Sequence, residues 1–356
     1  MRIGMISPYS LTVPGGVQGQ ILGLARALRD RGEYVRVLAP CDGPPPEPFV
    51  TPLGSCVPTG ANGSVVPLAP DPSAQLRTIR ALRDEEFDVL HLHEPMAPGP
   101  TTTAMLVRAA PMVATFHRAG HSKAYDAFRP LLARGARRLA IRFAVSDDAE
   151  ATAFEALGGT YERAFNAVEL NRYRIGMPTK ADGPTIFFVA RHEERKGLSD
   201  LLAAFALLDP DVRLWIGGDG PETADLQSQY AGDPRISWLG EIDEDEKISR
   251  MRGADVFCAP SRHGESFGIV LLEAMAARTA VVASGIPGYA RVVRNGLDGA
   301  LFTARDHVAL ATELADVLRN TARREALVES GDARVQEFSM ARLADVYLAA
   351  YRRVMP

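Results

Sequence analysis

The fold of this chain is decided by residues 2–39, RIGMISPYSLTVPGGVQGQILGLARALRDRGEYVRVLA. The stretch begins with a short apolar run, Arg2 to Ser7, and ends with a second one, Tyr34 to Ala39. Between them, residues 17–31 repeat apolar side chains at helical spacing, at Ile21, Leu24, Ala25 and Leu28. A strand, a helix and a second strand in this order predict a parallel βαβ unit.

The same alternation continues along the chain in two series. In the first, further strands are predicted at Asp88 to Leu92, Met112 to Phe116 and Leu139 to Val145. In the second, strands are predicted at Thr185 to Val189, Val212 to Ile216, Ile236 to Leu239, Asp255 to Ala259 and Ala280 to Ala283, with helices at Leu198 to Leu208, Asp243 to Arg252 and Phe267 to Ala277. Two doubly wound parallel sheets in tandem, an α/β fold, are the simplest interpretation.

The length of 356 residues also favours two domains. We expect a first domain at 1–168, a polar linker with two prolines at 169–184, and a second domain at 185–339. The last helix, Met340 to Val354, carries its apolar residues on one face and is expected to pack back on the first domain. The proline-rich stretch Cys41 to Pro72 is predicted as a long loop.

Composition excludes several classes of protein. A net charge of −4 gives no electrostatic reason to expect nucleic acid as a partner. The three cysteines lack C-x-x-C spacing, which argues against a disulfide framework and a zinc site and fits a reducing cytoplasm. The chain shows no signal peptide and no run near the roughly 20 apolar residues of a membrane span, so we expect membrane contact to be peripheral.

Three loops at predicted strand ends could carry chemistry, because ligands of open parallel sheets bind there. In Ser7 to Gln18, Gly15 and Gly16 open a helix whose bare N–H groups and positive dipole end suit an anion; an ordinary tight turn is the alternative. The G-x-G-x-x-G fingerprint is not matched, which counts against a nicotinamide dehydrogenase. In Arg191 to Gly197, the cations Arg191 and Lys196 flank a turn and could neutralise the charge of a diphosphate. The alternative is that this segment is a charged turn exposed to solvent.

The third loop, Pro260 to Ala276, contains two acids eight residues apart, Glu265 at the expected helix start and Glu273 two turns inside. Gly268 would let a ligand approach the N–H groups of the first turn. Glu265 alone could simply compensate the helix dipole. Glu273, inside an apolar run, needs a partner, which strengthens the functional interpretation.

Taken together, Gly15-Gly16, Arg191 with Lys196, and the E-x7-E stretch from Glu265 to Glu273 make the chain resemble the retaining glycosyltransferases of family 4. Within that family it looks most similar to the actinobacterial phosphatidylinositol alpha-mannosyltransferases, through segments 6–10, 13–18, 88–95, 114–117 and 264–270. The resemblance implies the GT-B fold, with two Rossmann-like doubly wound domains facing a cleft. It also implies transfer of a hexosyl group, mannose from GDP-mannose, to a phosphatidylinositol-like lipid by a cytoplasmic enzyme at the inner face of the cell membrane.

The resemblance also implies roles for single residues. The implied catalytic residues are His117, Arg191, Lys196 and Glu265. The implied donor-binding residues are Gly15, Gly16, Arg191, Lys196, Glu265, Ser266, Phe267, Gly268, Ile269 and Glu273. The implied acceptor-binding residues are Tyr9, Gln18, Asn62, His117 and Lys123. Catalysis would rest on leaving-group electrostatics and positioning, so no cofactor and no metal are expected.

Several alternatives stay open. Ala61 stands where the mannosyltransferases carry a tyrosine before Asn62-Gly63-Ser64, so a soluble or polysaccharide acceptor remains an alternative. A UDP-sugar donor also remains an alternative, because the base is recognised largely by backbone and loop shape. Seven basic residues in 118–142 could face an anionic acceptor or membrane, or form a solvated helix face. His91, His93 and His117 could suggest a metal site, although structural or substrate roles are favoured.

Two further functions are weighed against transfer. Epimerisation of a nucleotide sugar would need proton-moving carboxylates, for which Glu94 is the obvious candidate in the first domain. A non-catalytic sugar-nucleotide binding protein is ranked last, because the whole set of Arg191, Lys196, Glu265 and Glu273 is present. The two D-x-D stretches, at 209–211 and 243–245, are assigned to a turn and a helix start rather than to a metal.

Overall fold

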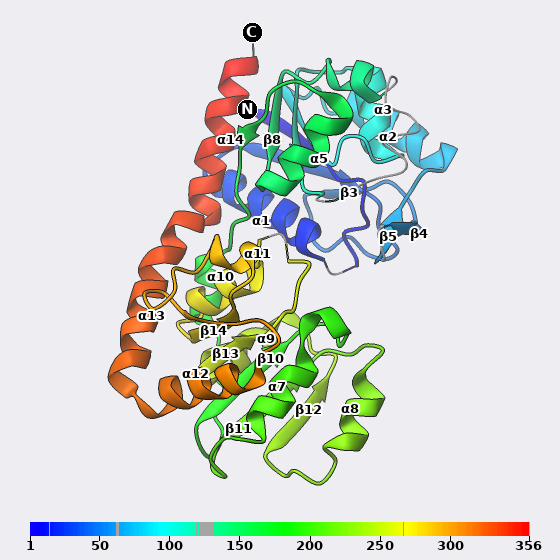
Figure 1. Ribbon diagram of the computed structural model, residues 1–356. Helices are drawn as coiled ribbons and strands as arrows, with labels where there is room; N and C mark the ends of the chain where they lie inside the picture. Colours follow the sequence, from blue (N-terminus) through cyan, green and yellow to red (C-terminus); the bar gives the residue numbers. More distant parts are fainter. Residues whose placement is uncertain (14, 62–63, 119, 121–131, 266, 356) are drawn as a thin grey trace. The chain divides into compact units, whose positions relative to one another are not determined.

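The structure is a computed structural model that describes residues 1–13, 15–61, 64–118, 120, 132–265 and 267–355. The chain divides into two compact units (Figure 1). Unit 1 contains residues 1–167 together with 340–356, and unit 2 contains residues 168–339.

In the described part of unit 1, seven parallel strands form one sheet in the order β3-β2-β1-β6-β7-β8-β9. Its strands are β1 (Arg2–Ile6), β2 (Tyr34–Ala39), β3 (Val50–Pro52), β6 (Val89–His93), β7 (Met112–Phe116), β8 (Ile141–Ala144) and β9 (Glu162–Arg163), and a separate antiparallel pair is β4 (Val57–Ala61) and β5 (Ser64–Leu68). Its helices include α1 (Gly16–Asp30), α2 (Pro72–Asp84), α3 (Pro100–Val107), α5 (Asp147–Leu157) and α14 (Met340–Val354). The strand order reverses between β1 and β6, so this is the switch point of the sheet.

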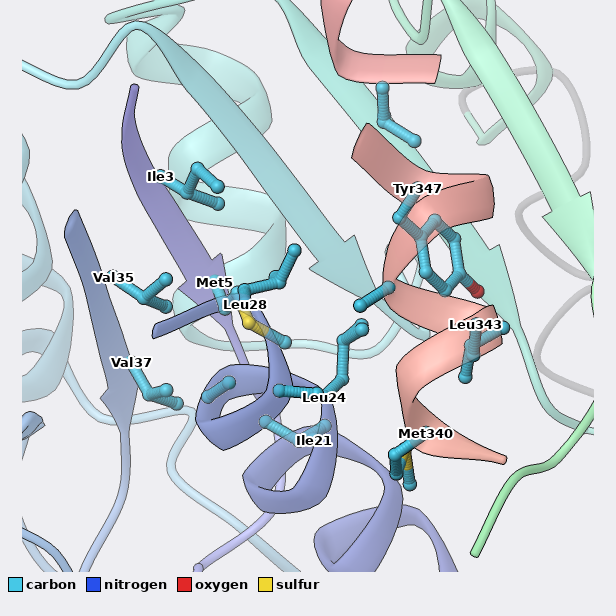
Figure 2. Packing of buried hydrophobic residues seen from close by; sticks show 14 of the residues in the cluster. Ile3, Met5, Ile21, Leu24, Leu28, Val35, Val37, Met340, Leu343 and Tyr347 are labelled. Carbon is cyan, nitrogen blue, oxygen red and sulfur yellow. The ribbon is translucent and has the colours of Figure 1, made fainter. Parts of the chain in front are cut away.

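Helix α14 belongs to unit 1 because its apolar face completes the core beside α1. Figure 2 shows Ile21, Leu24 and Leu28 of α1 in the same cluster as Met340, Leu343 and Tyr347 of α14. These six side chains are almost completely buried. At the rim, Nε of Arg31 donates to Asp345 at 2.7 Å. The last helix of the chain is thus part of the first sheet's covering layer.

In the described part of unit 2, six parallel strands form a second sheet in the order β12-β11-β10-β13-β14-β15. Its strands are β10 (Thr185–Val189), β11 (Arg213–Gly217), β12 (Ile236–Gly240), β13 (Val256–Ala259), β14 (Ala280–Ser284) and β15 (Ala300–Phe302). Its helices include α6 (Leu170–Ile175), η1 (Glu194–Lys196), α7 (Leu198–Phe205), α8 (Thr223–Gln229), α9 (Glu244–Gly253), α10 (Ile269–Ala276), α11 (Pro287–Ala290), α12 (His307–Arg319), α13 (Thr321–Val335) and η2 (Gln336–Phe338). The order reverses between β10 and β13. The predicted fold class, two doubly wound parallel sheets, is confirmed.

Two segments differ from the sequence-based prediction. The stretch Cys41 to Pro72 contains the edge strand β3 and the β4–β5 hairpin rather than one long loop. Its prolines mask the strand pattern, yet Pro58 and Pro67 face each other in a two-stranded ladder, where edge positions tolerate proline. The expected linker 169–184 contains α6, and Tyr173 of this helix is only 4% exposed. Burial of Tyr173 ties the segment to unit 2, and six residues are too few to show a helical period.

Candidate active site

The site residues predicted in unit 2 lie at the switch point of its sheet. Arg191 and Lys196 follow β10, and the loop 260–268 follows β13. These two strands are hydrogen-bonded neighbours, with Ile186 opposite Val256. The carboxyl ends of the two strands therefore bring both loops to the place where open α/β sheets bind ligands.

Glu265 is the residue on which the two loops converge. Its Oε1 accepts from Nζ of Lys196 at 2.5 Å, from Nη1 of Arg195 at 3.2 Å and from Oγ of Ser261 at 3.3 Å. The Lys196 and Glu265 side chains are 20% and 15% exposed, so their attraction is only partly screened by water. Two residues predicted separately from the sequence are thus in direct contact, and Arg195 joins them.

The two loops are also locked together through their backbones. The N–H of Arg262 donates to the carbonyl of Arg195 at 2.7 Å. Gly197 has a φ of +71°, and a Cβ there would lie 2.1 Å from the carbonyl oxygen of Pro260. The guanidinium of Arg262 binds both carboxylate oxygens of Asp200, at 2.8 and 2.7 Å. Close backbone packing and this bidentate pair hold Lys196 and Glu265 in register.

Arg191 stands at the exposed side of the same switch point. Its side chain is exposed, and it has no ion-pair partner among the residues that the structure describes. The glycine loop after β11 packs against its neighbours: a Cβ on Gly218 would lie 2.0 Å from the oxygen of Ala190, and one on Gly220 would lie 2.4 Å from that of His192. This loop was not predicted from the sequence, although three glycines in 217–220 at a strand end were a usable signal.

The helix that follows Glu265 begins later than predicted. Helix α10 starts at Ile269, with Gly268 as its N-cap at a φ of +80°, so Glu265 precedes the helix and Glu273 lies just over one turn inside it. A Cβ on Gly268 would lie 2.5 Å from Cδ1 of Tyr289. The positive φ keeps the chain out of the helix until Ile269. Phe267 is buried against Phe338, and Ser266 lies outside the described residues.

Glu273 has the partner that its apolar surroundings required. Nζ of Lys247, on α9, lies 3.1 Å from Oε2 of Glu273 and 3.0 Å from Oε2 of Glu244. The hydroxyl of Tyr173 donates to Oε1 of Glu244 at 2.9 Å. Burial raises the pKa of Tyr173, and the charges of Glu273 and Glu244 raise it further. Sequence reasoning missed Lys247 and Tyr173, because no local motif announces contacts between α6, α9 and α10.

In unit 1, the glycine pair after β1 opens α1 as predicted. Gly16 is the first residue of the helix, and a Cβ there would meet no atom within 4 Å. Gly15 is the N-cap, and the side chain of Gln18 lies against it, where a Cβ would be 2.4 Å from Oε1. The first turn contains no acidic residue. This helix start therefore leaves room and positive dipole character for an anion.

His117 follows β7, one strand from the switch point of unit 1. Its Nε2 lies 3.0 Å from Nδ1 of His93, and the two rings are stacked. Burial lowers the pKa of His117 to about 4, so its imidazole is neutral at physiological pH. The Glu94 carboxylate accepts the N–H groups of His117 and Arg118. Glu94 is 2% exposed and serves as a backbone anchor, which disfavours the proton-moving role that epimerisation would require.

Tyr9 lies in the electrostatic range of Glu94. Burial raises the pKa of the Tyr9 hydroxyl, and the Glu94 charge raises it further, while Arg118 lowers it. The residue also pairs with Leu68 across an isolated bridge. Tyr9 and His117, both predicted for the acceptor, are thus brought into one region of unit 1. Of the other three acceptor predictions, Gln18 is buried beside Gly15, and Asn62 and Lys123 lie outside the described residues.

His91 is a core residue rather than a free ligand. Its Nδ1 lies 2.7 Å from the hydroxyl of Tyr351, and its Nε2 lies 2.8 Å from Oγ1 of Thr115. Thr115 in turn lies 2.8 Å from the hydroxyl of Tyr347. Both imidazole nitrogens of His91 are therefore engaged, which argues against the metal site considered for the three histidines. In the described residues no group of three metal-ligating side chains is found.

The remaining sequence candidates have identifiable structural roles. Asp243 caps α9 by accepting from the N–H of Glu246 at 2.8 Å, as expected for a helix start. In the basic segment, Arg138 and Arg142 donate to backbone carbonyls, whereas Arg134 and Arg137 are exposed. Residues 121–131 of this segment lie outside the description. In the described chain no helix is long and apolar enough to cross a membrane.

Comparison with known proteins places these features in a family. The family model Glycosyltransferase Family 4 matches residues 14–165, and the model Glycosyl transferases group 1 matches residues 172–334. The chain is 42% identical to a phosphatidyl-myo-inositol mannosyltransferase of Mycobacterium leprae, over 99% of this chain and 97% of that protein. It is 33% identical to a protein of the same name from Propionibacterium freudenreichii, over 85% and 82%.

Solved structures agree on the fold. HepE of Anabaena, in complex with UDP and glucose, superposes with a TM-score of 0.74 at 19% identity, covering 99% of this chain and 100% of that one. Sucrose-phosphate synthase from Thermosynechococcus elongatus superposes with a TM-score of 0.73 at 20% identity, covering 99% and 98%. With both halves matched by family models and relatives similar over nearly the whole length, the chain belongs to family 4 of the glycosyltransferases.

Proposed function

We propose that this glycosyltransferase moves a mannosyl group from GDP-mannose to a phosphatidylinositol-like lipid, with retention of the anomeric configuration. The observation that carries the proposal is the similarity to phosphatidyl-myo-inositol mannosyltransferases, at 42% identity over 99% of the chain. The geometry at the switch point of unit 2 supports the transferase chemistry independently, because it gathers cations and an acid where a nucleotide sugar would bind.

The donor diphosphate is assigned to Lys196 and Arg191. Lys196 gives one N–H to Glu265, and an ammonium carries three, so two donors remain for phosphate oxygens. Arg191 is exposed and presents its planar guanidinium, which suits bidentate binding of phosphate. In unit 1, the helix start at Gly15 and Gly16 is proposed separately as a phosphate-binding element. Lys196 and Arg191 would stabilise the charge that develops on the leaving diphosphate.

The sugar and the nucleoside are assigned to the two acids. Glu265 is fixed by Lys196 and Arg195 and is proposed to accept hydrogen bonds from sugar hydroxyls. The N–H groups at the start of α10, after Gly268, lie beside it in sequence. Glu273 is proposed to accept the ribose hydroxyls. His117, being neutral, is proposed to hydrogen-bond a hydroxyl of sugar or acceptor rather than to add a positive charge.

We further propose that transfer requires no divalent cation and takes place at an anionic membrane surface facing the cytoplasm. Lys196 and Arg191 supply the positive charge that a metal would otherwise bring to a diphosphate. The exposed Arg134 and Arg137 of unit 1 suit attraction to anionic headgroups, at about 1 kcal/mol for each cation near the surface.

The proposal is tested by incubating the purified protein with radiolabelled GDP-mannose or UDP-glucose and vesicles with or without phosphatidylinositol. We expect label in the lipid fraction only with GDP-mannose and phosphatidylinositol together. Glu273→Ala should weaken donor binding without unfolding, whereas Glu325→Ala, which changes an exposed acid of α13, should not. Transfer from UDP-glucose alone, transfer to a soluble glycan, or epimerised sugar without acceptor would each overturn the proposal.

A further inference from the structure

A charged cluster surrounds Glu273, and three of its residues, Tyr173, Glu244 and Lys247, have no role in the function proposed above. Three elements contribute: Tyr173 from α6, Glu244 and Lys247 from α9, and Glu273 from α10. Lys247 lies between the two carboxylates, at 3.0 Å from Glu244 and 3.1 Å from Glu273, and its ammonium stands 5.7 Å from the centre of the Tyr173 ring. The Lys247 and Glu273 side chains are each 16% exposed.

The cluster has one positive charge for two negative charges. Burial on its own would lower the pKa of Lys247, but Glu273 and Glu244 outweigh it and raise that pKa. Burial would likewise raise the pKa of Glu244, but Lys247, the hydrogen bond from Tyr173 and the charge of Arg172 together outweigh it and lower that pKa. Both side chains of this pair are therefore charged at neutral pH. An excess negative charge favours neutral hydroxyl donors and disfavours anionic groups such as a phosphate on the ribose.

We infer that Lys247 is a positioning residue that holds the Glu273 carboxylate so that it accepts the 2′- and 3′-hydroxyls of the donor ribose. This inference rests on the proposed function of Glu273. Lys247 occupies one oxygen, Oε2, and a carboxylate offers about four lone-pair sites, so acceptor capacity remains for a diol. Because Lys247 of α9 contacts Glu273 of α10 directly, the orientation of Glu273 is fixed by packing between these two helices.

The alternative is that Lys247 only stabilises the packing of these helices. That role would weaken binding of every nucleotide equally, whereas a positioning role acts through the ribose hydroxyls. The two roles are separated by the ratio of affinities for GDP and 2′-deoxy-GDP, measured by titration calorimetry. A charge-assisted hydrogen bond to the 2′-hydroxyl should make that ratio roughly 10 or more in the unaltered protein.

The variants are chosen as matched sets. Lys247→Met removes the ammonium and keeps the length of the side chain, and Lys247→Arg keeps a cation. Glu244→Gln leaves Lys247 paired with Glu273 alone. The double variant Lys247→Met with Glu244→Gln removes one charge of each sign and so preserves the net charge. It replaces the single variant Lys247→Met if that variant folds poorly. Lys180→Met changes an exposed lysine of unit 2 as the control.

We expect the GDP preference to fall to about twofold or less in Lys247→Met and in the double variant, and to persist in Lys247→Arg, Glu244→Gln and Lys180→Met. An unchanged preference for GDP over 2′-deoxy-GDP in Lys247→Met would overturn the inference. So would a loss of that preference in Glu244→Gln as large as the loss in Lys247→Met. Either outcome would leave the proposed function intact. If the unaltered protein bound neither GDP nor UDP, the proposed function itself would fail and the inference with it.

Discussion

Acidification should destabilise unit 1 through the buried imidazole of His91. This imidazole is 0% exposed and lies against His93 on its own strand, Thr115 on β7, and Tyr347 and Tyr351 on α14. Burial, with a smaller contribution from the charge of His117, lowers its pKa from 6.5 to about 3. The folded state therefore keeps the ring neutral, while the unfolded chain takes up a proton below pH 6.5.

The sign and size of the effect follow from proton linkage. Between pH 6.5 and about 3 the unfolded state binds more protons, so the stability that is fully present above 6.5 is lost as the pH falls. With these two pKa values, His91 alone removes about 2 kcal/mol of unfolding free energy between pH 7.5 and pH 5. Burial lowers the pKa values of His93 and His117 as well, which acts in the same direction.

The assay is urea unfolding at pH 7.5 and 5.0, followed by pulsed hydrogen exchange and mass spectrometry. Peptides from β6 and α14 report unit 1, and peptides from β10 report unit 2. The variant His91→Gln cannot titrate in this range. It should be less stable at pH 7.5 by about 1–3 kcal/mol, because a buried hydroxyl loses its partner, yet its unit 1 should lose about 2 kcal/mol less on acidification. If the unfolding free energy of unit 1 fell by the same amount between pH 7.5 and 5.0 in the unaltered protein and in His91→Gln, this account of His91 would be refuted.

Three further predictions use the site itself. Gly268→Ala should lower the stability of unit 2 by about 1–3 kcal/mol, read from the fluorescence of Trp215 and Trp238, because a Cβ at this positive φ meets Tyr289; unchanged stability would contradict it. His93→Leu should lower kcat by a larger factor than it changes the donor KM, because it removes the hydrogen-bond partner of His117, and His93→Asn should retain part of the lost kcat. Equal losses of kcat in both variants would argue against a role of His93 in positioning His117. Turnover should be unchanged by a chelator, and its abolition would show a required metal.

The fold and the loops at the switch points could be predicted because both depend on local pattern. Strands such as Tyr34–Ala39 and Met112–Phe116 were predicted with their observed bounds, since a buried parallel strand is a short apolar run between turn residues. Parallel topology then places the carboxyl ends of neighbouring strands side by side. For that reason Lys196 and Glu265, 69 residues apart, could be expected in one site.

What could not be predicted are contacts between the faces of helices. Lys247 and Glu273 are separated by 26 residues, and nothing in the charged run 243–247 distinguishes Glu244 and Lys247, which join the cluster, from the other acids of the run. Tyr173 was hidden because a helix of six residues shows no period. Such contacts depend on how α6, α9 and α10 pack, and that packing follows from the whole core of unit 2.

The contrast between contacts at strand ends and contacts between helices also explains why the two acids of the E-x7-E stretch have different surroundings. Both were predicted to lie along one helix, but Gly268 ends the loop and starts the helix between them. Glu265 is thereby left in the loop, where the β10 and β13 ends supply Lys196 and Arg195 as partners. Glu273 is placed on α10, where only a neighbouring helix can supply a cation, and α9 does so through Lys247. One glycine therefore separates a carboxylate at the strand ends, proposed to bind the sugar hydroxyls, from one between helices, proposed to bind the ribose.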